Sequence, residues 1–310
     1  MARKIIIDTD PGQDDAVAIL AALASPEELD ILAITAVAGN VPLRLTLENS
    51  LKLVELANRP DVPVYRGASR PMLKELVTAE YVHGPTGLDG ADLPPPTLEP
   101  APGHAVTAII DLVMSHDDVT LCTLGPLTNV GLALAMEPAI AGRISQLVLM
   151  GGGFFEGGNT TPAAEFNIFV DPHAAHRVFT SGIPLVMMPL DVTHKALGTP
   201  ERLQRFKDMG TPAGDAVYGM LDYYDRWDME KYGIPGAPIH DACVTAFLLE
   251  PDIFGGKHVH VEIETTPGPA LGMTVVDWWG VTGKEPNCTV MNTVDADRFF
   301  DLLVDRIGRL

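Results

Sequence analysis

Short runs rich in isoleucine and valine recur along the chain and alternate with amphipathic helical patterns. The runs are KIIID, DILAITAVAG, VPVYRG, VTLCTLG, ISQLVLMGGG and IPLVMMPLD, and the helical patterns include residues 14–24, 45–58, 104–115 and 172–181. Strands that are apolar on both faces and alternate with helices are typical of a mainly parallel sheet. The sequence therefore predicts an α/β fold, with an open, mainly parallel sheet and helices on both of its faces.

Neither a linker nor an internal repeat divides the sequence, so we expect one domain over residues 1–310. Residues 83–103 are rich in proline and glycine and predict a long surface loop, and residues 223–241 are a second candidate lid. About the last 55 residues are expected to be rich in strands and to close with a helix over residues 295–307.

The formal charge of −20 argues against a nucleic acid or an anionic membrane as partner. No apolar run approaches the roughly 20 residues of a membrane helix, and the start MARKIIIDTD lacks the apolar centre of a secretory signal. Three cysteines without a CxxC pattern indicate reduced thiols. These features lead us to expect a cytoplasmic protein.

The segment IIIDTDPGQDDAVAIL places Asp8, Asp10, Asp14 and Asp15 between an apolar strand and an apolar helix. Open α/β sheets bind ligands beyond the carboxyl ends of their strands, and we expect all four carboxylates to face one small volume there. Helix capping explains Asp14 or Asp15 alone but not the whole group. Because crowded carboxylates repel one another, a hard divalent cation such as Ca²⁺ would relieve the arrangement.

A strand followed by DxD also occurs in haloacid-dehalogenase-like phosphatases, where the first aspartate is a nucleophile and Mg²⁺ is bound. Here Gly12 stands where that motif has Thr or Val, and the Asp14-Asp15 pair is foreign to it. This phosphatase is the enzymatic alternative.

The segment DTDPGQDDAVA resembles the N-terminal signature of the inosine-uridine preferring nucleoside hydrolases. The resemblance continues in order through AVAGNV, HGPTGLDG, GPLTN, MGGGF, AEFNIFVDPHAA, APIHDACVTAF and a late PN. It implies the nucleoside hydrolase fold and a Ca²⁺-dependent enzyme of nucleoside salvage that cleaves a small-molecule ribonucleoside into base and ribose. It also implies a homodimer or homotetramer.

The resemblance further implies a ligand set for Ca²⁺. It assigns the metal to Asp10, both carboxylate oxygens of Asp15, Asp241 and the backbone carbonyl of Leu124, with ribose hydroxyls and a water completing the shell. Asp10 is implied to be the base that takes a proton from the attacking water.

Substrate contacts follow from the same resemblance. Asp14 is assigned to the ribose 2′-hydroxyl, Asn167 to the 3′-hydroxyl, and Asn159 with Glu165 to the 5′-hydroxyl, while Asn40 is expected near the metal. The remaining substrate-binding candidates, mostly on the base side, are His83, Met150, Phe166, Tyr224 and Tyr232.

His240 is the predicted proton donor to the departing base, since it precedes Asp241 and a histidine suits proton transfer near neutrality. The resemblance also implies, from the presence of this histidine, a pyrimidine or inosine-uridine preference rather than a purine-specific enzyme. The acidic rim without a phosphate cradle indicates a nucleoside rather than a nucleotide. A non-catalytic nucleoside- or ribose-binding protein is the other alternative, which intact Asp10 and His240 disfavour.

Overall fold

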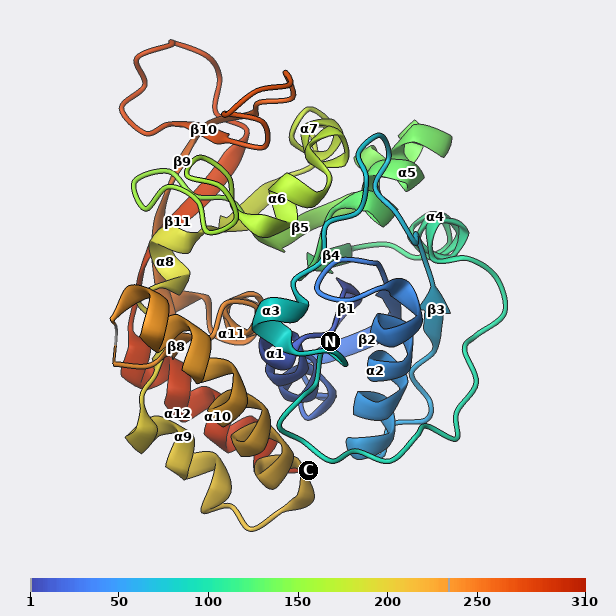
Figure 1. The fold of residues 1–310 in the computed structure, drawn as a ribbon. Coiled ribbons are helices and arrows are strands. Elements are labelled where there is room, and N and C mark those ends of the chain that lie inside the picture. Colours follow the sequence, from blue (N-terminus) through green and yellow to red (C-terminus); the bar gives the residue numbers. More distant parts are fainter. Residues whose placement is uncertain (1, 234) are drawn as a thin grey trace.

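The computed structural model of the chain describes residues 2–233 and 235–310, apart from the side chains of residues 225–232. Within this part, nine strands form one sheet in the order β10-β9-β11-β6-β5-β4-β1-β2-β3, and β7 with β8 forms a small second sheet (Figure 1). The strands are β1 Arg3–Thr9, β2 Leu29–Ala36, β3 Val64–Arg66, β4 Val119–Thr123, β5 Ile144–Met150, β6 Leu185–Met188, β7 Leu197–Gly198, β8 Ala237–Pro238, β9 Phe254–Ile263, β10 Thr274–Asp277 and β11 Cys288–Val294.

The helices of the described residues cover this sheet and the edge beyond its strands. They are α1 Gln13–Leu23, α2 Leu43–Leu56, α3 Glu80–His83, α4 Ala105–Ser115, α5 Thr128–Met136, α6 Phe166–Val170, α7 Pro172–Phe179, α8 Leu190–Thr193, α9 Pro200–Lys207, α10 Pro212–Tyr232, α11 Ala242–Leu249 and α12 Ala296–Ile307, with 3-10 turns at Pro138–Gly142 and Pro251–Ile253. None of them combines the length and apolarity that a membrane crossing needs.

Strand pairing confirms the mainly parallel sheet. β1 pairs in parallel with β2 and with β4, and the parallel pairs continue from β2 to β3 and from β4 through β5 and β6 to β11. The antiparallel pairs of this sheet, within the described residues, are β9 with β10 and β9 with β11. The predicted strand-rich end of the chain therefore extends the main sheet at one edge.

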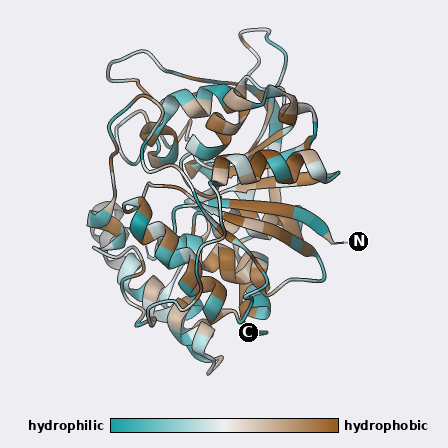
Figure 2. Ribbon diagram, turned by 90° about the vertical axis from the view of Figure 1, so that its right-hand side faces the viewer, coloured by the Kyte–Doolittle hydropathy of each residue, from teal (hydrophilic) through white to brown (hydrophobic). Residues whose placement is uncertain are grey.

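Helices lie on both faces of the sheet, as the sequence predicts. One apolar core joins α1, α2, α11 and α12 to one face of the strands, and a second joins α4, α5 and α7 to the other face. Figure 2 shows the hydrophobic strands enclosed between these helical layers. Each strand is apolar on both faces because both faces are covered.

The predicted loop and the candidate lid differ in the structure. Apart from His83, which ends α3, the loop at residues 83–103 contains no helix or strand, and only an isolated bridge joins Tyr65 to Ala101. The candidate lid at residues 223–241 begins instead as the end of α10 and continues to β8.

The order of the strands places a crevice beside β1. The chain passes from β1 to β2 and β3 on one side and then returns with β4 to the other side of β1. Loops that follow β1 and β4 therefore leave the sheet in different directions, which opens a site at their carboxyl ends.

Asn129, at the start of α5, ties these strand ends together. Its Nδ2 donates to Asp8 Oδ1 at 2.7 Å and to the Ala36 carbonyl at 3.1 Å, and its Oδ1 accepts from the backbone N–H of Ala68 at 2.8 Å. The side chain is fully buried. One amide thus connects β1, β2 and the segment after β3.

We predict that Asn129→Ala lowers the free energy of unfolding by about 3 kcal/mol, because it leaves buried polar groups without partners. Urea denaturation measures this loss. Asn292→Ala is the control, since the Asn292 side chain makes no hydrogen bond with the described residues, and its effect should stay within about 0.5 kcal/mol. Equal effects of the two substitutions would contradict the structural role of Asn129.

Candidate active site

A cavity opens beyond the carboxyl ends of β1, β2, β4 and β5. It encloses about 670 Å³ including space open to solvent. Its lining residues are Asp14, Asn40, Ala79, Tyr81, Val82, His83, Leu124, Met150, Asn159, Thr160, Glu165, Phe166, Asn167, His194, Tyr224, His240 and Asp241.

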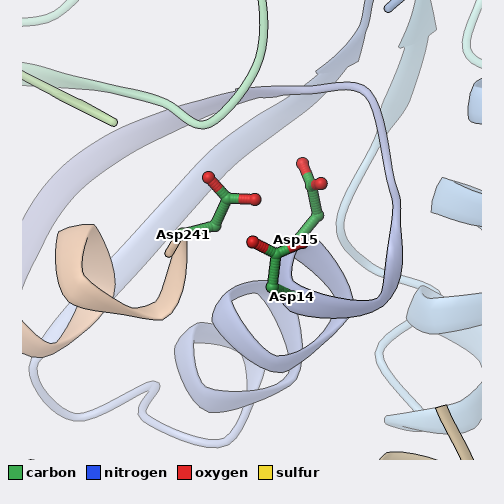
Figure 3. Close-up of side chains that lie close together, drawn as sticks. All are labelled: Asp14, Asp15 and Asp241. Carbon is green, nitrogen blue, oxygen red and sulfur yellow. The ribbon is translucent and has the colours of Figure 1, made fainter. Parts of the chain in front are cut away.

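Acidic side chains gather on one side of this cavity. Carboxylate oxygens of Asp14 and Asp15, from the first turn of α1, and of Asp241, which precedes α11, lie within 4.8 Å of one another (Figure 3). Asp10 follows β1 and is also buried. One oxygen each of Asp10, Asp14 and Asp241 is buried without a hydrogen-bond partner among the described residues.

The electrostatics of the cluster disfavour its ionised form in the protein alone. Burial, followed by the charge of Asp15, raises the pKa of Asp14 to about 7. Burial and neighbouring carboxylates raise the pKa of Asp10 and of Asp241 well above the usual range, and burial raises the pKa of Asp15. A hard cation fits this arrangement, because it would coordinate the unpartnered oxygens and offset the repulsion among the carboxylates.

Neutral donors fix the orientation of two of these carboxylates. Asp15 accepts from Thr9 Oγ1 at 2.6 Å, from the Gly12 N–H at 3.0 Å and from Asn40 Nδ2 at 3.1 Å. The Asn40 N–H donates to Asp10 Oδ2 at 2.7 Å. Asn40 therefore joins Asp10 to Asp15.

The expectation that Asp8 shares this volume is wrong. Its Oδ1 accepts from Thr35 Oγ1 at 2.5 Å and from Asn129 Nδ2 at 2.7 Å, and burial raises the pKa of Asp8 to about 7. Asp8 lies within β1 and no neighbouring carboxylate contributes to its pKa, whereas Asp10 lies beyond the strand end and is repelled by Asp15 and Asp14. The cluster consists of Asp10, Asp14, Asp15 and Asp241.

Two glycines leave room for Asp10, a requirement that the sequence analysis missed. A Cβ at Gly39 would lie 2.0 Å from Asp10 Oδ2, and one at Gly125 would lie 2.1 Å from Oδ1. Any side chain at either position would collide with the Asp10 carboxylate, so both positions require glycine.

Amides and a carboxylate face the cavity from the segment around α6. Asn167 Nδ2 donates to the Leu124 carbonyl at 2.7 Å and to the Met150 carbonyl at 3.3 Å. Glu165 caps α6 and accepts from the N–H groups of Gly152, Asn167 and Ile168. This side offers paired donors and acceptors, as a pocket for sugar hydroxyls requires.

Asn159 lies close to Glu165. The N–H of Phe166, the residue after Glu165, donates to Asn159 Oδ1 at 2.9 Å. Burial raises the pKa of Glu165 to about 7, against the lowering effect of the backbone donors. The cavity wall thus contains a carboxyl group that ionises near neutrality.

Histidines and aromatic rings form another part of the wall. His83 stacks on Tyr224 with a centroid distance of 5.5 Å, and its Nδ1 lies 2.8 Å from Gln13 Oε1. Gln13 Nε2 donates to two carbonyls, so Oε1 is the acceptor and His83 Nδ1 carries the hydrogen. Burial lowers the pKa of His83 to about 3, which keeps the ring neutral.

His240 lies directly before Asp241 and is 8% exposed. Its Nδ1 is 2.7 Å from Thr193 Oγ1, and its ring centroid is 5.7 Å from that of His194. Burial, with smaller contributions from His194 and His83, holds the pKa of His240 well below its usual range. A neutral imidazole in this position offers one N–H and one lone pair.

The structure brings most of the predicted site residues together. Those that line the cavity are Asp14, Asn40, His83, Leu124, Met150, Asn159, Glu165, Phe166, Asn167, Tyr224, His240 and Asp241, and Asp10 and Asp15 are linked to them through Asn40. The side chain of Tyr232 lies outside the described residues.

Several lining residues were missed, chief among them His194. It caps the end of α8, the short helix that follows β6. Applying the strand-end rule to β6 as well as to β1 would have identified it. Ala79, Tyr81, Val82 and Thr160 carry no signal in the sequence that separates them from ordinary loop residues.

The sequence model of the inosine-uridine preferring nucleoside hydrolases matches residues 5–301. A pyrimidine-specific ribonucleoside hydrolase, RihA of Klebsiella pneumoniae, is 48% identical over 310 residues that cover 99% of both chains. A solved purine-preferring ribonucleoside hydrolase from Gardnerella vaginalis has a TM-score of 0.92 at 31% identity, with 99% of this chain and 98% of that chain covered. A plant nucleoside hydrolase has a TM-score of 0.92 at 33% identity, with 99% of each chain covered.

We predict that ionisation of Glu165 makes the fold less stable as the pH rises. Its folded pKa of about 7 exceeds the ordinary value of 4.5, so its stabilising effect is full below pH 4.5 and is lost as the pH rises through 7. The free energy of unfolding should fall by roughly 3 kcal/mol more between pH 4.5 and 8 in the unmodified protein than in Glu165→Gln. Urea denaturation across this range measures the slope.

Glu99→Gln serves as the control for this measurement, because Glu99 is exposed and the variant retains Glu165. Its pH slope should follow that of the unmodified protein. Parallel slopes for Glu165→Gln and the unmodified protein would contradict the prediction.

Proposed function

Because the chain belongs to the inosine-uridine preferring nucleoside hydrolase family, we propose that it is a Ca²⁺-dependent ribonucleoside hydrolase with a preference for pyrimidine nucleosides. The products are the free base and ribose. The proposal includes one domain over residues 1–310, a role in cytoplasmic nucleoside salvage, and assembly as a homodimer or homotetramer.

One observation carries the choice of a hard cation: buried carboxylate oxygens of Asp10, Asp14 and Asp241 lack hydrogen-bond partners among the described residues, and Asp14 and Asp241 line the cavity. We assign the cation to Asp10, Asp15, Asp241 and the Leu124 carbonyl, because oxygen-only ligands suit Ca²⁺. When bound, Ca²⁺ would bind ribose hydroxyls and raise the acidity of a water.

The protein groups supply the other steps. We assign Asp10 as the base that receives a proton from the attacking water, because its Oδ1 is buried and unpartnered. Asp14 and Asn167 would hold the 2′- and 3′-hydroxyls, and Asn159 with Glu165 the 5′-hydroxyl. Carboxylates around the sugar favour the positive charge that develops on ribose as the bond to the base breaks.

His240 would serve the leaving base. Its buried ring is neutral in the free protein, so it assists departure by donating from a ring N–H. Neither a cationic side chain nor a glycine-rich phosphate cradle lines the cavity within the described residues, which disfavours the phosphatase alternative.

The pyrimidine preference rests on His240 and on the relatives. RihA of Klebsiella pneumoniae, named as pyrimidine-specific, shares 48% of the residues with this chain, whereas the purine-preferring Gardnerella enzyme shares 31%. The greater similarity to the pyrimidine-specific enzyme supports the preference.

Turnover of a nucleoside panel tests the proposal. With Ca²⁺ present, kcat/KM for uridine and cytidine should exceed that for inosine and guanosine, and 2′-deoxyuridine should be a poor substrate. Chelation should abolish release of reducing sugar, and added Ca²⁺ should restore it. Binding of uridine without turnover would favour a binding protein, and full activity in protein shown by elemental analysis to be metal-free would exclude the metal assignment.

We predict that Gly125→Ala lowers Ca²⁺ affinity by about 10–100-fold, as is usual when a group that orients a metal ligand is disturbed. The added Cβ would lie 2.1 Å from Asp10 Oδ1 and would therefore displace that oxygen. Calorimetric titration with Ca²⁺ measures the change.

Gly142→Ala is the matched control, because nothing lies within 4 Å of a Cβ at that position. It should bind Ca²⁺ like the unmodified protein. Unchanged affinity in Gly125→Ala would remove Asp10 from the ligand set.

A further inference from the structure

The short helix α8 ends in a buried hydroxyl that touches His240. Thr193 Oγ1 lies 2.7 Å from His240 Nδ1, and Thr193 has no exposed surface. Thr193 does not line the cavity. It therefore reaches the site only through the histidine.

The position of α8 is fixed by contacts on its other side. Asp191 accepts from the N–H groups of Phe154, Phe155 and Glu156 at 2.9, 2.9 and 3.2 Å. The N–H of Leu190 donates to the Gly152 carbonyl at 2.9 Å. The hydroxyl of Thr193 is thus held by a helix that the neighbouring loop clamps in place.

The hydrogen-bond inventory decides which atom donates. Within the described residues, Thr193 Oγ1 has no partner other than His240 Nδ1. A buried O–H without an acceptor is costly, so the hydroxyl hydrogen points to Nδ1. Nδ1 is then the acceptor, so the ring carries its hydrogen on Nε2.

We propose that Thr193 is a positioning residue that holds His240 as the Nε2–H tautomer, so that this N–H donates a hydrogen bond to the departing base. The inference rests on the hydrolase function proposed above. It concerns hydrogen bonding alone and includes no proton transfer.

The chemistry of departure explains why this tautomer matters. As the N-glycosidic bond breaks, its electron pair moves onto the base, and the oxygen and nitrogen acceptors of the base become more negative. A donor aimed at them binds the transition state more strongly than the ground state, which raises kcat. The opposite tautomer would present a lone pair to the same atoms.

Kinetics of Thr193→Val test the role. This substitution keeps the shape of the side chain and removes the hydroxyl. With uridine, kcat should fall about 5- to 30-fold, the size expected for one buried hydrogen bond, while KM changes by less than about twofold. With p-nitrophenyl riboside, whose leaving group departs without a donor, kcat should change by less than about twofold.

Two variants separate positioning from packing. Thr193→Ser retains the hydroxyl and should restore uridine turnover to within about threefold of the unmodified enzyme. Thr245→Val removes another buried hydroxyl, which donates to the Ala18 carbonyl at 3.0 Å, and should leave both substrates unaffected. Equal slowing of both substrates by Thr193→Val, or no difference from Thr245→Val, would overturn the proposal.

The tautomer can also be read without any turnover. In protein labelled with ¹⁵N-histidine, the nitrogen signals that vanish in His240→Gln should show hydrogen on Nε2, and those that vanish in His83→Gln should show hydrogen on Nδ1. An Nδ1–H tautomer of His240 would overturn the proposal even if Thr193→Val fails to fold. If the unmodified protein does not turn over nucleosides, the hydrolase function is rejected. The ¹⁵N measurement still tests whether Thr193 sets the tautomer of His240.

Discussion

Repulsion among buried carboxylates is the constraint on which the rest of this structure depends. Asp10, Asp14, Asp15 and Asp241 converge at the edge of an apolar sheet, and within the described residues no lysine or arginine lines the cavity beside them. Their neighbours are neutral donors such as Thr9 and the backbone N–H groups of Gly12 and Asn40. Neutral donors orient carboxylates without cancelling their charge, so the cluster keeps the negative charge that would attract a cation.

The fold meets this constraint by drawing the acids from separate elements. Asp10 comes from the end of β1 and Asp14 with Asp15 from the start of α1, while Asp241 arrives from a distant part of the chain at the start of α11. The close approach of Gly39 and Gly125 to Asp10 lets the loops after β2 and β4 close around it. The shape of the crevice beside β1 therefore depends on the loops that pack around Asp10.

Local sequence signals suffice for the fold but only partly for the site. The five predicted helices agree with the structure to within two residues at each end, because apolar periodicity reports burial directly. The ligand group around Asp10 follows from a strand end and a helix start. Alternation within the strand, however, could not separate Asp8 from Asp10, since the difference lies in where β1 stops. The contact of Thr193 with His240 joins residues 47 positions apart, and no spacing rule predicts such a pair.

His83 and His240, two of the three histidines that line the cavity, illustrate what long-range packing adds. His83 gives its Nδ1 hydrogen to Gln13 and leaves Nε2 as an acceptor, whereas His240 receives a hydrogen at Nδ1 from Thr193 and leaves Nε2–H as a donor. Both partners are neutral. A carboxylate partner would favour the imidazolium and add a positive charge beside the aspartates. The amide and hydroxyl partners of His83 and His240 instead give the cavity one donor and one acceptor, whereas His194, the third lining histidine, lies 3.3 Å from the Glu156 carboxylate.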